Sequence, residues 1–83
     1  MKIQLRYFAS LREALGTSEM FEAADGSTVG AVRDGLIARG GAHAQALSRH
    51  RAVRCALNKT LCADDDVLSD GAELAFFPPV TGG

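Results

Sequence analysis

The chain closes with Asp70-Gly71-Ala72-Glu73-Leu74-Ala75-Phe76-Phe77-Pro78-Pro79-Val80-Thr81-Gly82-Gly83. Asp70-Gly71 is a turn signal, and the apolar run after it predicts a strand over residues 73–77. The two prolines end that strand because they remove two backbone donors and fix φ. Two terminal glycines are costly to order and bury no side chain. We therefore expect residues 78–83 to form an extended tail that serves another protein rather than the fold.

The rest of the chain alternates between short strands and helices. Ser10–Glu13 has the S-x-x-E form of a capping box, and Gly16 is placed to end that helix. Thr28 is expected to cap a second helix, in which Gly30 and Gly35 allow close approach to a sheet. The other expected elements are strands over residues 2–8, 19–23, 53–57 and 60–62 and a short helix over residues 42–49. This order predicts a single α+β domain over residues 1–77, with helices on one face and the first and last strands side by side in the centre.

Strand parity turns two aromatic side chains away from the core. Residues 2–8 alternate between apolar and polar, so that Phe8 lies on the face opposite Ile3 and Leu5. If Phe76 faces the core, Phe77 faces outward. On neighbouring strands, Phe8 and Phe77 would form an exposed aromatic patch, a feature that tends to mark partner sites. The alternative is that either ring folds over the end of the sheet and packs on a helix.

Composition excludes several classes of partner. Charged residues make up 23% of the 83 residues and the net charge is −1, so no basic excess exists to hold nucleic acid or an anionic membrane. No apolar run approaches the length of a transmembrane helix, and the alternating start lacks the apolar core of a signal peptide. These features lead us to expect a cytoplasmic protein.

No internal set of residues has the spacing of a catalytic or metal site. His43 and His50 show no carboxylate or cysteine partner in the sequence and are interpreted as a solvated pair. Asp64–Asp66 lacks the glycine and glutamate of a calcium loop. Cys55 is expected to be a small buried thiol, whereas the environment of Cys62 is left open; a disulfide is possible but unfavoured in a reducing compartment. We expect no bound cofactor or metal.

Three segments together resemble a known family. The ending Phe76-Phe77-Pro78-Pro79-Val80-Thr81-Gly82-Gly83 is similar to the C-terminus of the small, sulfur-carrying subunits of molybdopterin synthase. Asn58–Leu61 resembles the hairpin of that family, and Arg6–Glu13 resembles its first strand and helix. The ending is highly specific, whereas a diglycine alone would be a weak signal. The resemblance implies a ubiquitin-like β-grasp fold with a mixed sheet.

The resemblance also implies a function for Gly83. A ubiquitin-activating-like adenylyltransferase would use ATP to adenylate the Gly83 carboxylate, and a sulfurtransferase would supply the sulfur that leaves Gly83 as a thiocarboxylate. Inside a heterotetramer with the large, catalytic subunit, this group would donate sulfur to cyclic pyranopterin monophosphate. The resemblance places Phe8, Leu61 and Phe77 on the partner-binding surface, and the tail residues that enter the partner would be Pro78, Pro79, Val80, Thr81 and Gly82.

Other functions share parts of this pattern. The sulfur carrier of thiamine biosynthesis has the same fold, diglycine and activation chemistry, although the Phe-Phe-Pro-Pro-Val segment favours molybdopterin. A ubiquitin-like modifier that forms isopeptide bonds would use the same acyl-adenylate. The third alternative is a plain β-grasp interaction domain with an inert tail.

Overall fold

The computed structural model describes residues 1–79, so the predictions for Val80, Thr81, Gly82 and Gly83 lie outside the described residues. Strands and helices alternate along the chain in nearly the predicted order. The strands are β1 (Lys2–Tyr7), β2 (Ser18–Glu22), β3 (Arg54–Leu57), β4 (Thr60–Leu61) and β5 (Glu73–Phe77), and the helices are α1 (Ser10–Leu15), α2 (Val29–Ala38) and α3 (Gly41–Leu47). The last strand has the predicted bounds, and the others differ from prediction by one or two residues at an end.

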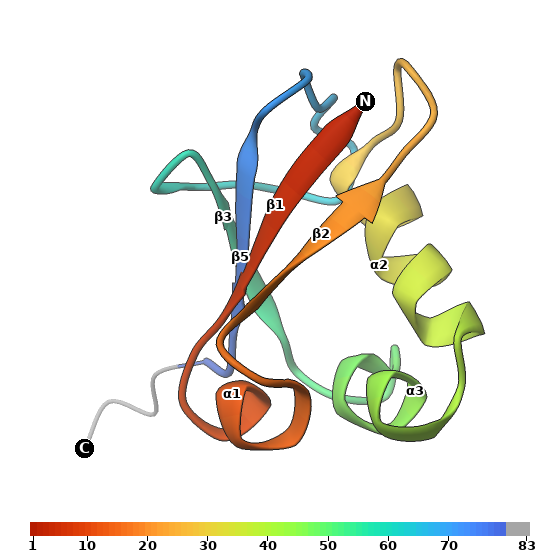
Figure 1. Ribbon diagram of the computed structural model, residues 1–83. Coiled ribbons are helices and arrows are strands. Elements are labelled where there is room, and N and C mark those ends of the chain that lie inside the picture. Colours follow the sequence, from red (N-terminus) through yellow and green to blue (C-terminus); the bar gives the residue numbers. More distant parts are fainter. Residues whose placement is uncertain (80–83) are drawn as a thin grey trace.

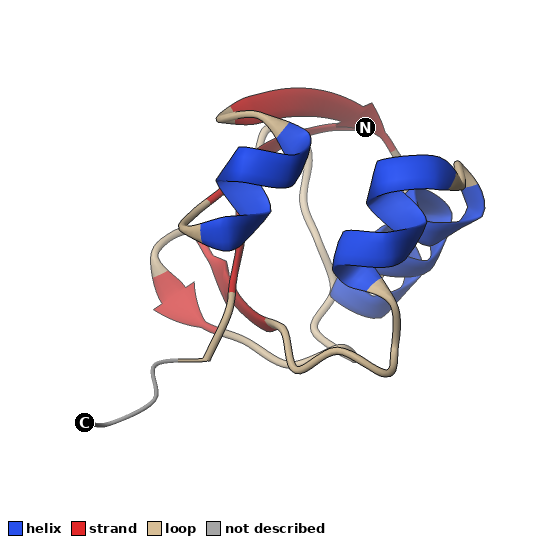
Figure 2. Cartoon of the chain, turned by 90° about the horizontal axis from the view of Figure 1, so that it is seen from below, coloured by secondary structure: helices blue, strands red, loops and turns tan. Residues whose placement is uncertain are grey.

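The five strands form one mixed sheet in the order β2-β1-β5-β3-β4. β1 and β5 lie side by side in the middle and run parallel, whereas the other pairs are antiparallel (Figure 1). The prediction that the first and last strands are central neighbours is therefore confirmed. The helices lie together on one side of the curved sheet (Figure 2), which confirms the predicted α+β arrangement.

The core lies between the sheet and the helices, as strand alternation predicts. Leu5 of β1 pairs with Leu74 of β5, and Tyr7 pairs with Phe76, so that each pair shares the inner face. The Tyr7 and Phe76 rings stack with centroids 6.3 Å apart. Burial of a large apolar side chain stabilises the folded state by about 2–3 kcal/mol, so these two rings are substantial contributors to the core. The fully buried side chains are Ile3, Leu5, Tyr7, Val29, Val32, Leu36, Leu47, Leu74 and Phe76.

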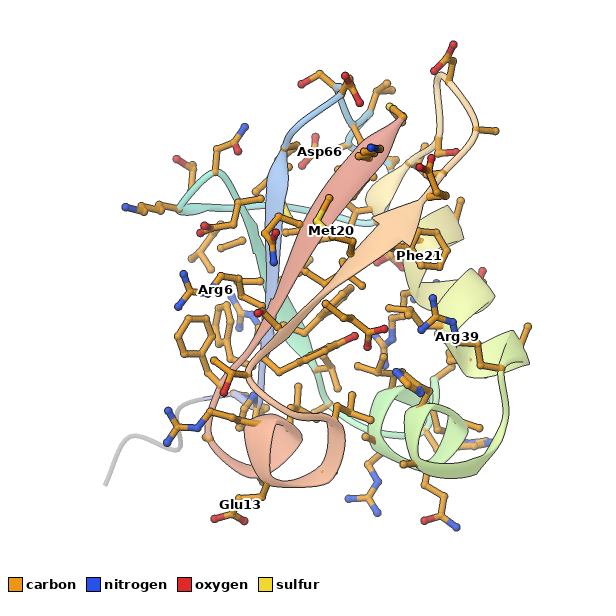
Figure 3. The ribbon with its side chains drawn as sticks, in the orientation of Figure 1. Arg6, Glu13, Met20, Phe21, Arg39 and Asp66 are labelled. Atoms are coloured by element: carbon orange, nitrogen blue, oxygen red, sulfur yellow. The ribbon has the colours of Figure 1, made fainter. Side chains whose placement is uncertain are left out.

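Helix α2 approaches β2 closely at a glycine, as expected. A Cβ on Gly35 would lie 2.9 Å from Cζ of Phe21, a distance that real side chains do not adopt. The Arg39 guanidinium carbon lies 5.4 Å from the centre of the same ring, and Figure 3 shows both side chains in the space between β2 and α2. A Cβ on Gly30 would instead lie 3.1 Å from the side chain of Asp64, which belongs to a loop. Only Gly35 therefore serves the contact with the sheet.

One of the two predicted helix caps is correct. Thr28 precedes α2, and its hydroxyl accepts a hydrogen bond from the Ala31 backbone N–H at 3.2 Å. The capping box at Ser10 is wrong, because the helix begins one residue earlier than that motif requires. Ala9 holds the cap position with φ of 54°, and no side chain caps α1. Ser10 is thus already helical.

A buried arginine that the sequence analysis missed holds the end of α3. Arg33 is 7% exposed and forms no ion pair with a carboxylate of residues 1–79. Its Nε donates to the Leu47 carbonyl at 2.8 Å, and its Nη2 donates to the carbonyls of Ser48 and Arg51 at 2.8 and 3.2 Å. The last carbonyls of a helix lack partners within the helix. Arg33, which lies on α2, donates hydrogen bonds to these carbonyls. These bonds fix how α3 and the loop after it pack against α2.

We predict that Arg33→Met lowers the free energy of unfolding by about 3 kcal/mol, because three inward carbonyls lose a charged donor. Urea denaturation measures this change. Arg12→Met is the matched control, since Arg12 lies on an exposed part of α1, and it should change stability by less than roughly 0.5 kcal/mol. Equal effects of the two substitutions would contradict the role assigned to Arg33.

Candidate functional site

The described residues contain no metal centre. Within residues 1–79, no group of three or more His, Cys, Asp or Glu side chains is arranged to hold a metal ion. Over the same residues, no helix has the length and apolar character needed to cross a membrane. Three places carry groups with chemical potential: the half-buried carboxylate of Glu19 with its partners, the two thiols and the outer face of the sheet.

The carboxylate cluster centres on Glu19 of β2. Oε2 of Glu19 accepts a hydrogen bond from the Tyr7 hydroxyl at 2.8 Å and lies 2.8 Å from Nε2 of His43, while Oε1 accepts from Arg39 Nη1 at 2.6 Å. Burial by itself would raise the pKa of Glu19, but the hydrogen bonds from His43, Arg39 and Tyr7 outweigh it and hold that pKa below its ordinary value. Each oxygen is thus already engaged within the fold.

This cluster corrects the interpretation of His43 as a solvated residue. The partner lies 24 residues away in sequence, on β2, and only the packing of α3 against the sheet brings the two together. Burial and then the hydrogen bond to Glu19 raise the pKa of Tyr7, so its hydroxyl stays protonated as a donor. The arrangement ties β1, β2, α2 and α3 to one carboxylate, which is a structural role.

The two thiols face each other at the β3–β4 hairpin, where Cys55 lies in β3 and Cys62 directly follows β4. The Cys62 backbone N–H donates to the Cys55 carbonyl at 3.1 Å, and the two sulfur atoms are 3.2 Å apart as free thiols. Cys55 is buried, as predicted, and Cys62 is half-buried. Burial first, then the hydrogen bond to Cys55, raise the pKa of the Cys62 thiol to about 12. Since the thiolate is the nucleophile, Cys62 is poorly suited to sulfur chemistry.

The outer face of the sheet carries the residues singled out from the sequence. Cross-strand pairing places Leu61 opposite Ala56 and Ala56 opposite Ala75, so these three share the face that lacks helices. Phe8 follows β1, and its N–H donates to the Phe76 carbonyl at 3.2 Å, which sets Phe8 beside Phe77 at the end of β5. Phe8 is 42% exposed, Leu61 is 63% exposed and Phe77 is half-buried.

Phe8, Ala56, Leu61 and Phe77 share this face with Ala75, which is buried beneath its neighbours, and we call these five apolar residues the outer patch. The outward direction predicted for Phe8 is confirmed by its exposure, and the pairing of Phe77 with Arg54 places the half-buried Phe77 on the same face. Leu61 was placed on this surface only by resemblance, because its register was not readable from the sequence. Exposed apolar areas of this kind mark binding sites for other proteins.

The tail leaves the sheet beside this patch. Pro78 and Pro79 follow β5 without regular secondary structure and are half-buried. Pro78 also lines a groove of about 320 Å³ between α1 and α3, together with Leu11 and Ala46. The rest of the predicted tail, residues 80–83, lies outside the described residues. The structure thus brings Phe8, Leu61 and Phe77 onto one face and starts the tail at the centre of that sheet.

Comparison with known proteins identifies relatives along nearly the whole chain. The family model described as "ThiS family" matches residues 5–83. The molybdopterin synthase sulfur carrier subunit of Escherichia coli K12 is 44% identical over 81 residues, which cover 98% of this chain and 99% of that protein.

Solved structures agree with the fold. SAMP1 from Haloferax volcanii superposes with a TM-score of 0.80 at 28% identity, with both chains fully covered. A ubiquitin from Caldiarchaeum subterraneum gives a TM-score of 0.61 at 21% identity, covering 100% of this chain and 98% of that one. The latter likeness concerns the fold alone, and it confirms the predicted ubiquitin-like β-grasp.

We predict that native Cys62 is alkylated slowly and that its rate keeps rising up to about pH 10 without levelling off. In the urea-unfolded chain, the rate should level off above the ordinary thiol pKa of about 8.5. Iodoacetamide labelling followed by tryptic mass spectrometry resolves the two thiols, because cleavage after Lys59 separates Cys55 from Cys62. A native rate that levels off near the ordinary value would contradict the raised pKa.

The same pKa difference has a consequence for stability. The folded state keeps the Cys62 thiol protonated while the unfolded state ionises, so the unfolded state binds fewer protons above the ordinary pKa. The free energy of unfolding should therefore fall as the pH rises from the ordinary thiol pKa towards about 12.

Proposed function

This chain belongs to the ThiS family, and on that premise we propose that it is the sulfur carrier of molybdopterin synthase. One observation carries the proposal: β5 runs from the centre of the sheet into Pro78-Pro79, and the sequence continues as the slim, uncharged Val80-Thr81-Gly82-Gly83. The segment after β5 is anchored in the sheet at its start, and its last two residues are glycines without side chains. Such a segment suits a terminal carboxylate that must enter a narrow site. The E. coli relative, named a sulfur carrier subunit, supports this function.

The chemistry proposed for Gly83 starts from a poor electrophile. A free carboxylate resists attack, so an adenylyltransferase first joins it to AMP at the expense of ATP, with release of pyrophosphate. The terminal sulfur of a donor persulfide then attacks the Gly83 carbonyl carbon, and AMP leaves. A thiol reduces the resulting acyl disulfide to release the thiocarboxylate. Covalent activation divides one difficult transfer into easier steps.

The partner in the next step is the large subunit, which we expect to form a heterotetramer with two copies of this chain. We propose that the outer patch docks on the large subunit while residues 78–83 enter its active site. Six residues in an extended, proline-started conformation reach roughly 19 Å. Catalytic groups would come from the large subunit, where the thiocarboxylate donates sulfur to cyclic pyranopterin monophosphate. This division of labour is consistent with the internal engagement of Glu19 and with the protonated thiol of Cys62.

We predict that incubation with the cognate adenylyltransferase, ATP and a persulfide donor exchanges one oxygen of Gly83 for sulfur. Intact-mass spectrometry measures the gain, and fragmentation assigns it to the last residue. A variant that lacks Gly83 is the control and should keep its original mass. An unchanged mass of the full chain, under conditions that charge the E. coli carrier, would contradict the proposal.

A second prediction concerns the outer patch. Phe77→Ala should weaken binding to the large subunit by roughly 2 kcal/mol, about thirtyfold, because large aromatic side chains dominate interface free energies. Isothermal titration calorimetry measures the affinity, and thermal unfolding measures the separate effect on stability. Met20→Ala is the control, since Met20 is an exposed apolar residue on the same face but two strands away from β5. Loss of stability with unchanged affinity would assign Phe77 to the core instead.

One alternative function has an observation in its favour. The Haloferax structure with a TM-score of 0.80 is SAMP1, a small archaeal modifier protein, and a modifier would use the same acyl-adenylate. A modifier transfers its carbonyl carbon to a lysine amine, whereas a carrier transfers only sulfur. After reaction with cyclic pyranopterin monophosphate and the large subunit, a carrier should be recovered with its original carboxylate mass. Lysine-linked conjugates in place of molybdopterin would favour the modifier function.

A further inference from the structure

Two arginines border the outer patch at opposite corners. Arg6 of β1 pairs with Ala75, and Arg54 of β3 pairs with Phe77, so the two flank β5 from either side on the face without helices. They are separated by two strand spacings of about 4.8 Å and by two residues of about 3.3 Å, which gives about 12 Å between their Cα atoms. The apolar residues of the patch lie between and around them.

The guanidinium of Arg6 has unused hydrogen-bonding capacity. Its Nε is buried and has no partner within the described residues. The carboxylate of Glu73, on the same face, lies 3.8 Å from Nη1, which is an ion pair but too long for a hydrogen bond. The guanidinium carbon is 5.7 Å from the centre of the Phe8 ring, an arrangement that holds the side chain over the patch. Figure 3 shows Arg6 on the side of β1 away from α2.

Arg54 is exposed and makes no side-chain hydrogen bond or ion pair within residues 1–79. Three other arginines of this chain are engaged inside the fold. Arg33 binds backbone carbonyls, Arg39 binds Glu19, and Arg49 binds Asp34 and Asp64. Among residues 1–79, Arg12, Arg51 and Arg54 have no side-chain hydrogen bond or ion pair, and Arg6 has only the long ion pair to Glu73; of these four, Arg6 and Arg54 lie on the face of the outer patch.

We propose that Arg6 and Arg54 determine which large subunit this chain accepts, by pairing with carboxylates that border the partner's apolar docking surface. This inference rests on the proposed function. An arginine fork binds a carboxylate through two parallel hydrogen bonds, which fixes orientation as well as adding free energy. Charges at the border of an interface steer association and set its register. The partner that fits therefore presents an apolar centre with acidic side chains at two points about 12 Å apart.

A second copy of this chain fits the face less well. In a two-fold contact the same patch meets itself, so the arginines of one copy would approach those of the other. Among residues 1–79, Glu73 is the one acidic side chain that forms an ion pair with Arg6 and could offset that repulsion. The charge of the face thus favours a different, acidic partner over self-association.

The test compares affinities at low and high salt. The purified large subunit from the same organism is titrated with the wild-type chain, with the Arg6→Gln/Arg54→Gln double variant and with Lys2→Gln. Lys2 is the matched control, because it is a cation on the same face of β1 but lies four residues from Arg6. We expect the double variant to bind at least about tenfold more weakly at low salt. Its dissociation constant should also lose most of the salt dependence of the wild type.

Further variants separate charge from folding. The Arg6→Lys/Arg54→Lys variant should keep the salt dependence but recover only part of the affinity, since lysine cannot form the paired hydrogen bonds. Arg54→Gln alone removes an exposed guanidinium that makes no hydrogen bond or ion pair within residues 1–79, so its stability should match the wild type by thermal unfolding. Its affinity should still fall.

The outcomes distinguish this inference from the proposed function. A wild-type chain that does not bind the large subunit would contradict the proposed function. Binding by wild type that the double variant matches in affinity and salt dependence would overturn the arginine role alone. Sedimentation of the wild-type chain as a dimer, abolished by the double variant, would assign the face to self-association and also overturn the inference.

Discussion

The parallel pairing of β1 with β5 is the constraint on which the rest of the structure depends. A parallel pair cannot be closed by a tight turn, so the whole chain between Tyr7 and Glu73 must cross from one end of the sheet to the other. At the start of the pair, Asp70 accepts from the Lys2 N–H at 2.7 Å, and the Lys2 carbonyl accepts from Gly71 at 2.8 Å. At its other end both strands finish together. This brings Phe8 beside Phe77 and lets the tail leave from the most protected strand.

Two polar side chains on the helical side stabilise the segments that connect β1 to β5. Arg33 holds the end of α3, and Glu19 joins β2 to α2 and α3 through Arg39 and His43. Buried polar groups of this kind are costly unless they are fully paired, and these side chains have partners within the chain. The polar side chains on the helical side of the sheet therefore serve to stabilise the fold. The outer face has an apolar centre bordered by Arg6, whose ion pair to Glu73 is long, and by Arg54, which has no ion pair within residues 1–79; this is the face to which we assign partner binding.

The sequence predicted the parts of this structure that depend on local patterns. The strand over residues 73–77, the cap at Thr28 and the outward direction of Phe77 all follow from residues close together in the chain. The Arg33 contacts and the Glu19–His43 contact were missed because they join residues 14 to 24 positions apart and depend on how α3 packs. Ser10 failed as a cap because Ala9 adopts a positive φ that the local motif does not reveal.

The combination on the outer face has a physical logic for a carrier. A protein that delivers a group must bind each enzyme quickly and then leave, so very large apolar interfaces, which dissociate slowly, would be a disadvantage. Border charges accelerate encounter without adding apolar area, and they exclude partners of the wrong charge. The alternation of side chains along β1 and β5 predicts that Phe8 and Phe77 point outward, but it does not predict that two arginines border them. Arg6 and Arg54 become neighbours of the patch only through the register of three strands, with Ala75 and Phe77 as their cross-strand partners. In the function that we propose, recognition by the fold and delivery by the tail would therefore both depend on the position of β5.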